Sequence, residues 1–135
     1  MTQLLSKLAL LTLAAVAAPA AASAGAPFEG RWATPKRSVI IDVAPCGPAY
    51  CGTVVWASAK AKANAREGGT RNLVGTRLIE NIRPDGNGGF KGRGFVPKQN
   101  IHASAKIRKA GPNVMVVKGC ALGLVCKEQR WTKVN

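Results

Sequence analysis

Acidic residues and histidine are scarce in this chain of 135 residues, and their scarcity limits its chemistry. Six Asp and Glu residues and one His stand against 20 Lys and Arg residues. No two carboxylates have a spacing that suggests a catalytic pair or a metal cage. They are Glu29, Asp42, Glu67, Glu80, Asp85 and Glu128. His102 lies in an alternating polar and apolar segment, where a solvated surface position is expected. The sequence therefore predicts a protein that is not an enzyme and has no metal site and no cofactor.

Long apolar runs are also rare. The run Leu8–Ala18 is shorter than the roughly 20 residues that a membrane-spanning helix needs. It follows Lys7 and precedes the small residues Ala22–Ala24, which is the three-part pattern of a secretory signal peptide. We therefore expect a signal peptide over residues 1–24, cleavage after Ala24, and a single mature domain over residues 25–135. This exported domain is expected in the periplasm or outside the cell, without a transmembrane span.

Only four cysteines are present: Cys46, Cys51, Cys120 and Cys126. An even number in a short exported chain predicts two disulfides. We expect local pairing, Cys46 to Cys51 and Cys120 to Cys126, because these partners meet first. Long-range pairing is the alternative, since a bridge that closes a long loop contributes about 4 to 5 kcal/mol against about 2 for a local one. A zinc site built from four cysteines fits this spacing poorly.

Helical periodicity is nearly absent, and short runs rich in β-branched and aromatic residues take its place. Turn residues separate these runs, most clearly over Pro84–Gly89. The segment Ile101–Lys109 alternates apolar and polar side chains, which predicts a strand with one wet face. The expected strands are residues 30–34, 38–44, 52–57, 73–83, 90–96, 101–109, 114–119 and 127–134.

One segment interrupts this pattern. Residues 58–72 contain no large apolar side chain, so they are predicted to form a mobile basic loop or a short helix over Lys60–Arg66. Gly92 and Gly94 in one strand indicate a bend or a close backbone approach, as barrels require. About eight short antiparallel strands can close on themselves, which removes exposed edges. We therefore expect an all-β fold, a small antiparallel up-and-down β-barrel, with an open sandwich as the alternative.

Segments along the whole mature chain resemble, in order, the domain of unknown function 2147 family, which consists of small exported bacterial proteins. These segments are Gly30–Pro35, Cys46–Gly47, Cys51–Trp56, Leu73–Thr76, Asn81–Gly86 and Gln129–Thr132. The resemblance implies a lipocalin-like barrel of eight strands with no established activity. The segment Phe95–His102 departs from the family's usual pattern, so no role is carried over to it.

Gly30 and Trp32 are also similar to the glycine-x-tryptophan motif of lipocalin first strands. There the indole closes the floor of the barrel, and a basic residue of the last strand lies across it. The resemblance makes Arg130 the expected partner of Trp32, in a cation–π contact worth about 0.5 to 2 kcal/mol. Gly30, Trp32 and Arg130 are therefore expected to be structural, with a ligand-contact role for Trp32 as the alternative.

The barrel prediction and the resemblance favour a non-enzymatic binding module of the cell envelope that holds a small apolar or amphipathic ligand. The candidate ligand-binding residues are Tyr50, Trp56, Phe90 and Phe95. The competing interpretation is that these aromatic side chains fill the interior, since eight strands leave little more room than side chains need.

The formal net charge of +14 suggests a second class of partner. Such a charge attracts polyanions and anionic membrane surfaces, although it can also serve solubility alone. An exported protein meets little nucleic acid, so anionic envelope lipids or polymers are the expected partners. The candidate polyanion-binding residues are Lys60, Lys62, Arg66, Arg71, Lys106, Arg108 and Lys109. No feature of the sequence indicates an oligomeric state.

Overall fold

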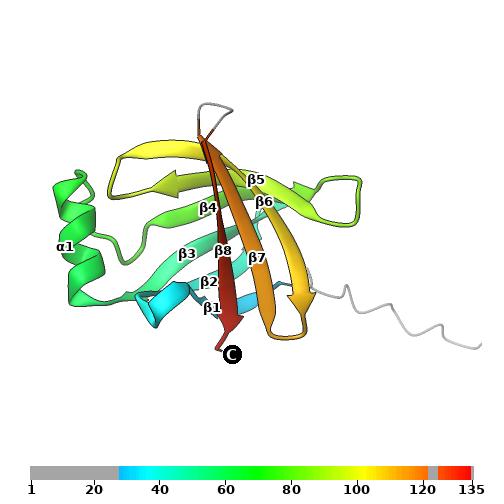
Figure 1. The fold of residues 1–135 in the computed structure, drawn as a ribbon, viewed down its shortest axis with the longest axis horizontal. Helices are drawn as coiled ribbons and strands as arrows, with labels where there is room; N and C mark the ends of the chain where they lie inside the picture. Colours follow the sequence, from blue (N-terminus) through cyan, green and yellow to red (C-terminus); the bar gives the residue numbers. More distant parts are fainter. Residues whose placement is uncertain (1–27, 122–124, 135) are drawn as a thin grey trace, which may run out of the picture.

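Eight antiparallel strands close into a barrel in the computed structural model, which describes residues 28–121 and 125–134 (Figure 1). The strands are β1 (Gly30–Ala33), β2 (Val39–Cys46), β3 (Ala49–Ala57), β4 (Arg77–Pro84), β5 (Phe90–Val96), β6 (Ile101–Gly111), β7 (Val114–Ala121) and β8 (Val125–Lys133). Each strand pairs with the next, and β8 returns to β1, where Trp32 lies opposite Lys133. The predicted up-and-down barrel is therefore confirmed.

Alternation along the strands places apolar side chains inside the barrel. In β6, Ala103, Ala105 and Ile107 are buried, while the residues between them are exposed. The largest difference from the predicted strands is at β4, which begins at Arg77. Leu73, expected at the start of this strand, lies in the preceding loop and is still buried in the core. Burial of an apolar residue therefore does not require a strand at that position.

Two disulfides close hairpins of the barrel. Cys46 is bonded to Cys51 at the β2–β3 turn, and Cys120 to Cys126 at the β7–β8 connection. The predicted local pairing is confirmed. Cys120 and Cys126 also lie directly opposite each other in the strand register. Each bridge closes a short loop, so by the loop-entropy estimate it contributes about 2 kcal/mol.

The basic segment between β3 and β4 forms helix α1 (Ala59–Glu67). Of the two predictions for this segment, a mobile loop or a short helix, the helix is confirmed. Ser58 begins the helix, because its Oγ accepts a hydrogen bond of 3.1 Å from the N–H of Ala61. Ala65 is buried, so a small residue provides the contact that larger apolar residues make elsewhere. Figure 1 shows α1 at one end of the barrel, near the β5–β6 turn. A 3₁₀ helix, η1 (Pro35–Arg37), connects β1 and β2.

The two ends of the barrel differ in how they are filled. The closed end, defined by the β4–β5 and β6–β7 turns, contains the aromatic core. There the ring of Phe28 contacts those of Tyr50 and Phe90 edge to face, at centroid distances of 6.0 and 4.3 Å. Gly92 permits close packing at this level, because a Cβ on it would lie 2.9 Å from the carbonyl oxygen of Glu80. The open end carries the β5–β6 turn, the end of β7, the start of β8 and α1.

No helix in the described part of the chain is long and apolar enough to cross a bilayer. The expected signal peptide, residues 1–24, and the expected start of the mature domain lie outside the described residues.

Candidate functional site

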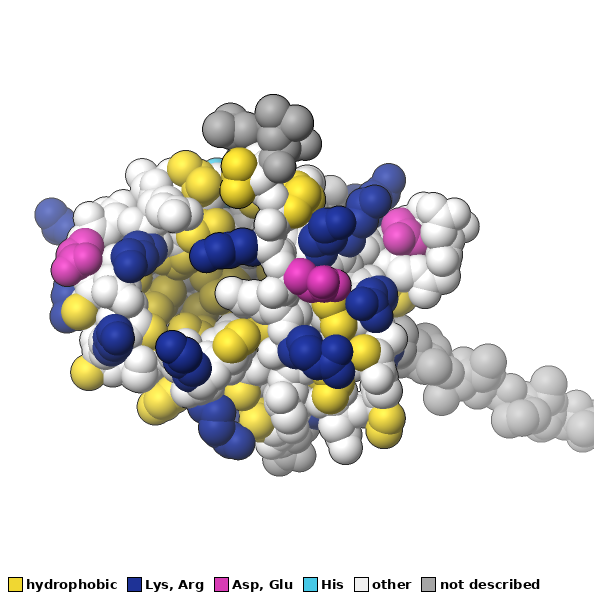
Figure 2. All heavy atoms as spheres, viewed as in Figure 1, with side chains coloured by type: hydrophobic (Ala, Val, Ile, Leu, Met, Phe, Trp, Pro, Cys, Tyr) yellow, Lys and Arg dark blue, Asp and Glu magenta, His cyan; other side chains and the backbone are white. Residues whose placement is uncertain are grey.

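A cavity of about 830 Å³ occupies the open half of the barrel. Figure 2 shows the hollow, with hydrophobic side chains on its floor and Lys or Arg side chains around its rim. The apolar side chains that line it include residues of β2, β4, β6, β7 and β8, of α1 and of the loop after it: Val39, Ala65, Leu73, Leu78, Ile79, Ala103, Ala105, Val117 and Trp131. The interior is therefore not filled by the protein's own side chains at this end.

The hollow exists because inward positions here carry small residues. Gly94, Ala103, Ala105 and Gly119 all line the cavity, and the register brings them together, with Gly94 opposite Ala103 and Ala105 opposite Gly119. At the closed end the inward positions carry large buried residues such as Met115 instead. The small side chains of β5, β6 and β7 therefore leave room for the cavity.

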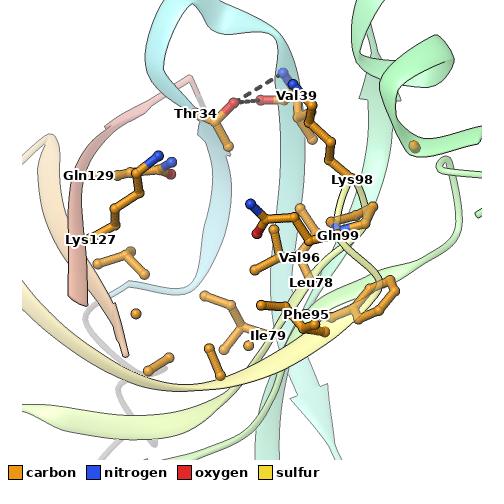
Figure 3. Close-up of a pocket in the computed structure, with 18 of the residues that line it drawn as sticks. Thr34, Val39, Leu78, Ile79, Phe95, Val96, Lys98, Gln99, Lys127 and Gln129 are labelled. Carbon is orange, nitrogen blue, oxygen red and sulfur yellow. Dashed lines mark hydrogen bonds between the residues drawn. The ribbon is translucent and has the colours of Figure 1, made fainter. Parts of the chain in front are cut away.

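Polar groups gather at one side of this cavity. They belong to Thr34, Ser38, Asn64, Lys98, Gln99, Lys127 and Gln129. Figure 3 shows the polar ends of Lys127, Gln129, Gln99 and Lys98 toward the side where Thr34 lies, whereas Leu78 and Ile79 lie toward the other side. None of the six Asp and Glu residues lines the cavity. The mouth therefore combines two cations and several hydrogen-bonding groups with no carboxylate.

The amide of Gln129 has a defined orientation at this mouth. The indole Nε1 of Trp131 donates a hydrogen bond of 2.9 Å to Oε1 of Gln129. Because an indole N–H can only donate, the oxygen of the amide must face Trp131. The Nε2 group then faces away from the indole, and its N–H donors have no partner among the described residues.

Three of the four predicted ligand-binding residues lie away from the cavity. Tyr50 and Phe90 pack around Phe28 at the closed end, and Trp56 is 48% exposed on the outside of the barrel. Phe95 does line the cavity, but its ring lies 5.1 Å from the imidazole of His102, which is on the outer face. For Tyr50 and Phe90 the competing interpretation, that aromatic side chains fill the interior, is the one that the packing supports.

The residues that sequence reasoning missed at the cavity are mostly small or polar: Gly94, Ala103, Ala105, Gly119, Lys127 and Gln129. The alternation of β6 predicted that Ala103 and Ala105 point inward. It did not indicate that small residues on the neighbouring strands lie beside them, because that depends on the register.

Trp32 is buried at the closed end of the barrel, and Arg130 is not the cation that lies over its ring. The indole is fully buried and donates a 2.6 Å hydrogen bond to the carbonyl oxygen of Phe28. The ammonium groups of Lys109 and Lys133 each lie 5.9 Å from its ring centroid. Arg130 is exposed, since it precedes the buried Trp131 and therefore points outward. The basic residue of the last strand that reaches Trp32 is Lys133, three positions further along. Gly30, which begins β1, has a φ of +119°, which glycine adopts readily.

The predicted polyanion-binding residues fall into two separate groups. One group is exposed on α1 and in the loop after it: Lys60, Lys62, Arg66 and Arg71. The other belongs to β6, which runs away from α1 toward the closed end (Figure 1): Lys106, Arg108 and Lys109. Arg108 lies 3.4 Å from a carboxylate oxygen of Glu128, and the ammonium group of Lys109 donates to the carbonyl oxygen of Pro112 at 3.2 Å.

Little in the cavity is suited to acid–base or nucleophilic chemistry. Its lining contains no Asp, Glu, His or Cys, and the hydroxyl of Thr34 is engaged by the backbone of Val39 at 3.2 and 3.3 Å. Within residues 28–121 and 125–134, no three His, Cys, Asp or Glu side chains come together as a metal site.

Comparisons with known proteins agree with the fold. The family model of DUF2147, described as an uncharacterised protein conserved in bacteria, matches residues 30–133. A solved structure, protein HP1028 from the human pathogen Helicobacter pylori, is described as belonging to the lipocalin family. It matches with a TM-score of 0.59 at 8% sequence identity, over 79% of this chain and 82% of that chain. No curated protein matches. With nearly the whole described barrel inside the family match, this chain belongs to the DUF2147 family.

Proposed function

We propose that this protein is an exported binding module of the bacterial cell envelope that holds a small apolar or amphipathic ligand inside its barrel, without catalysis. The observation that carries the proposal is the cavity of about 830 Å³ with apolar walls. Ligand sites in proteins usually measure about 300 to 1,000 Å³ and are lined by apolar groups with a few polar groups at defined positions. Apolar walls offer water no hydrogen bonds, so its replacement by an apolar ligand is favourable.

The proposed location rests on the leader and the disulfides. Residues 1–24 have the pattern of a signal peptide, and disulfides such as the two here are typical of oxidising compartments. An exported protein would lie in the periplasm or outside the cell.

Ala105 provides the decisive test, because it is buried and lines the cavity, whereas its neighbour Ser104 is exposed on the outer face. Ala105→Leu adds volume inside the cavity, and Ser104→Leu adds the same side chain outside. Titration of each protein with the neutral fluorescent dye Nile red, followed by displacement with dodecanol, measures binding. We expect saturable binding by the wild type and Ser104→Leu, and at least about tenfold weaker binding by Ala105→Leu. Absence of saturable, dodecanol-displaceable binding by the wild type would refute a ligand carrier.

A second candidate function, association with anionic envelope lipids, is supported by a row of like charges on the outer face. Arg83 lies opposite Lys91, Lys91 opposite Lys106, and Lys106 opposite Lys118, across four adjacent strands. All four are exposed. Like charges directly opposite each other destabilise a sheet. Two carboxylates offset part of this repulsion, since Glu128 lies opposite Lys118 and Asp85 interacts electrostatically with Lys106. An anionic surface would offset the remainder. This row includes Lys106 of the predicted polyanion residues but none from α1.

Vesicles that contain phosphatidylglycerol test this second function. We expect the protein to be retained on these vesicles at low salt, and the retained fraction to fall as the salt concentration rises. The double variant Lys91→Gln and Lys106→Gln should lose more retention than Lys60→Gln and Lys62→Gln on α1, although both remove two charges. Equal loss in both would indicate net charge rather than the row, and retention that is insensitive to salt would exclude an electrostatic cause.

A further inference from the structure

The inner face of β8 brings charged and polar side chains to the cavity. Lys127, Gln129 and Trp131 occupy alternate positions of this strand, and all three line the cavity. Their register partners on β7 include Gly119 and Val117, which also line it. Lys127 therefore lies at the mouth because of its position in the barrel, although its own side chain is exposed to solvent there.

The amide of Gln129, beside Lys127, presents hydrogen-bond donors. The bond from Trp131 occupies the oxygen of the Gln129 amide, so the amide turns its N–H groups away from the indole. Lys98, from the β5–β6 turn, adds a second ammonium group at the same mouth (Figure 3). A site that presents ammonium and amide donors complements a ligand group that accepts hydrogen bonds and carries negative charge.

No described Asp or Glu side chain lies within salt-bridge distance of these two ammonium groups. Among the described residues, the one salt bridge joins Arg108 and Glu128 on the outer face, and neither Lys98 nor Lys127 has an acidic partner within 4.0 Å. All six Asp and Glu residues of the chain lie in the described part, and none lines the cavity. The positive potential at the mouth is therefore available to a ligand.

We propose that the ligand is a single-chain amphiphile with an anionic head group, held by Lys127 and Gln129 at a mouth that Lys98 also lines, and with its chain directed into the apolar cavity. This inference rests on the proposed function and adds to it the charge and the orientation of the ligand. A neutral head loses the attraction to the ammonium groups, and a cationic head is repelled by them.

Three probes with the same chain and different heads test the charge: dodecanoate, dodecanol and dodecylamine. Near neutral pH the first is an anion and the last a cation, by analogy with the pKa values of Glu and Lys. Dissociation constants are measured at low and high salt. We expect dodecanoate to bind more tightly than dodecylamine, with a difference that shrinks at high salt, whereas dodecanol is insensitive to salt.

Two variants locate the head group. Lys127→Gln should weaken dodecanoate at least about fivefold and leave dodecanol unchanged within about twofold. Gln129→Glu keeps an oxygen acceptor for the indole of Trp131 but replaces the N–H donors with a negative charge. This variant should weaken the binding of dodecanoate more than Lys127→Gln does, and it should strengthen the binding of dodecylamine. Arg77→Gln is the matched control, because Arg77 is exposed, does not line the cavity and also carries one positive charge.

The outcomes separate this inference from the function beneath it. Suppose that dodecanol binds, but the two β8 variants weaken the binding of dodecanoate no more than Arg77→Gln does. The proposed anionic head site would then be wrong, whereas the proposed ligand-binding function would remain supported. If Lys127→Gln weakens dodecanoate and dodecanol equally, the lysine acts on the cavity rather than on charge, and the inference is again overturned. If none of the three probes binds the wild type, both fail together.

Discussion

Gly68, the residue that ends helix α1, lies so close to the β5–β6 turn that a Cβ atom at this position would overlap the carbonyl oxygen of Pro97. The absence of a side chain at Gly68 is therefore what allows α1 to dock against the turn. This contact shapes the mouth of the cavity, because Pro97, Lys98 and Gln99 all line it.

Gly68→Ala should lower the free energy of unfolding by about 1 to 3 kcal/mol, because the added methyl group meets backbone that cannot move aside easily. Urea denaturation measures the change. Gly119→Ala is the control: its Cβ would meet only the carbonyl oxygen of Ser104, at 3.9 Å. It should be neutral or slightly stabilising. Equal losses in the two variants would show that glycine replacement in general, not docking of α1, is responsible.

Trp131 should report on ligand binding through its fluorescence. It is nearly buried and lines the cavity, whereas Trp56 is exposed on the outside and Trp32 is buried at the closed end. We expect dodecanol to change the emission of the wild type and of Trp56→Phe, and most of this change to be lost in Trp131→Phe. A response that persists in Trp131→Phe and disappears in Trp56→Phe would place the ligand outside the barrel.

The two lysines that lie over the ring of Trp32 are expected to contribute to stability. Lys109 and Lys133 lie at the same distance from the ring of Trp32, so Lys109→Met and Lys133→Met should each lower the free energy of unfolding by about 0.5 to 1 kcal/mol through the lost cation–π contact. Arg130→Met, on the outer face of β8, should have almost no effect. Denaturation of each variant alone and combined with Trp32→Phe gives the coupling energies, and a larger coupling for Arg130 would restore it as the partner.

Asp85 makes the stability of the β4–β5 turn depend on pH. The N–H of Asn87, which donates to its Oδ1 at 2.7 Å, holds the pKa of Asp85 below its ordinary value of 3.8, with a smaller contribution from the N–H of Gly89 at 3.1 Å. A carboxyl whose pKa is lowered on folding stabilises the protein above its unfolded pKa, and this stabilisation is lost as the pH falls through the folded value.

Asp85→Ala should therefore lower the melting temperature at neutral pH, and its difference from the wild type should shrink in acid. Asp85→Asn keeps an oxygen acceptor without the charge, so its effect should be smaller and should depend less on pH. Thermal melts at neutral pH and below pH 3.8 make the comparison. A difference between Asp85→Ala and the wild type that grows in acid would contradict the assigned role of the carboxylate.

The strand alternation and turns of this chain were sufficient to predict a barrel, but not which of its ends is hollow. The aromatic residues Tyr50 and Phe90 were reasonable candidates for a cavity wall, because aromatic side chains often line ligand sites. Their position near Phe28 depends on which strands meet at the closed end, and no local pattern contains that information. Similarly, a basic residue of the last strand was expected at Trp32, but the inward direction of Lys133, and the outward direction of Arg130, became clear only with the register.

What the sequence determined by itself is local: most of the strands, the turns between them, the preference of Cys46 for its near neighbour Cys51, and the excess of positive charge. These follow from side chains that are neighbours in the chain. The tertiary structure alone decided where the cavity lies and that Lys98 and Lys127 both line it. The physical reason is that closing a barrel sets the register between strands, and the register determines which distant residues share the interior.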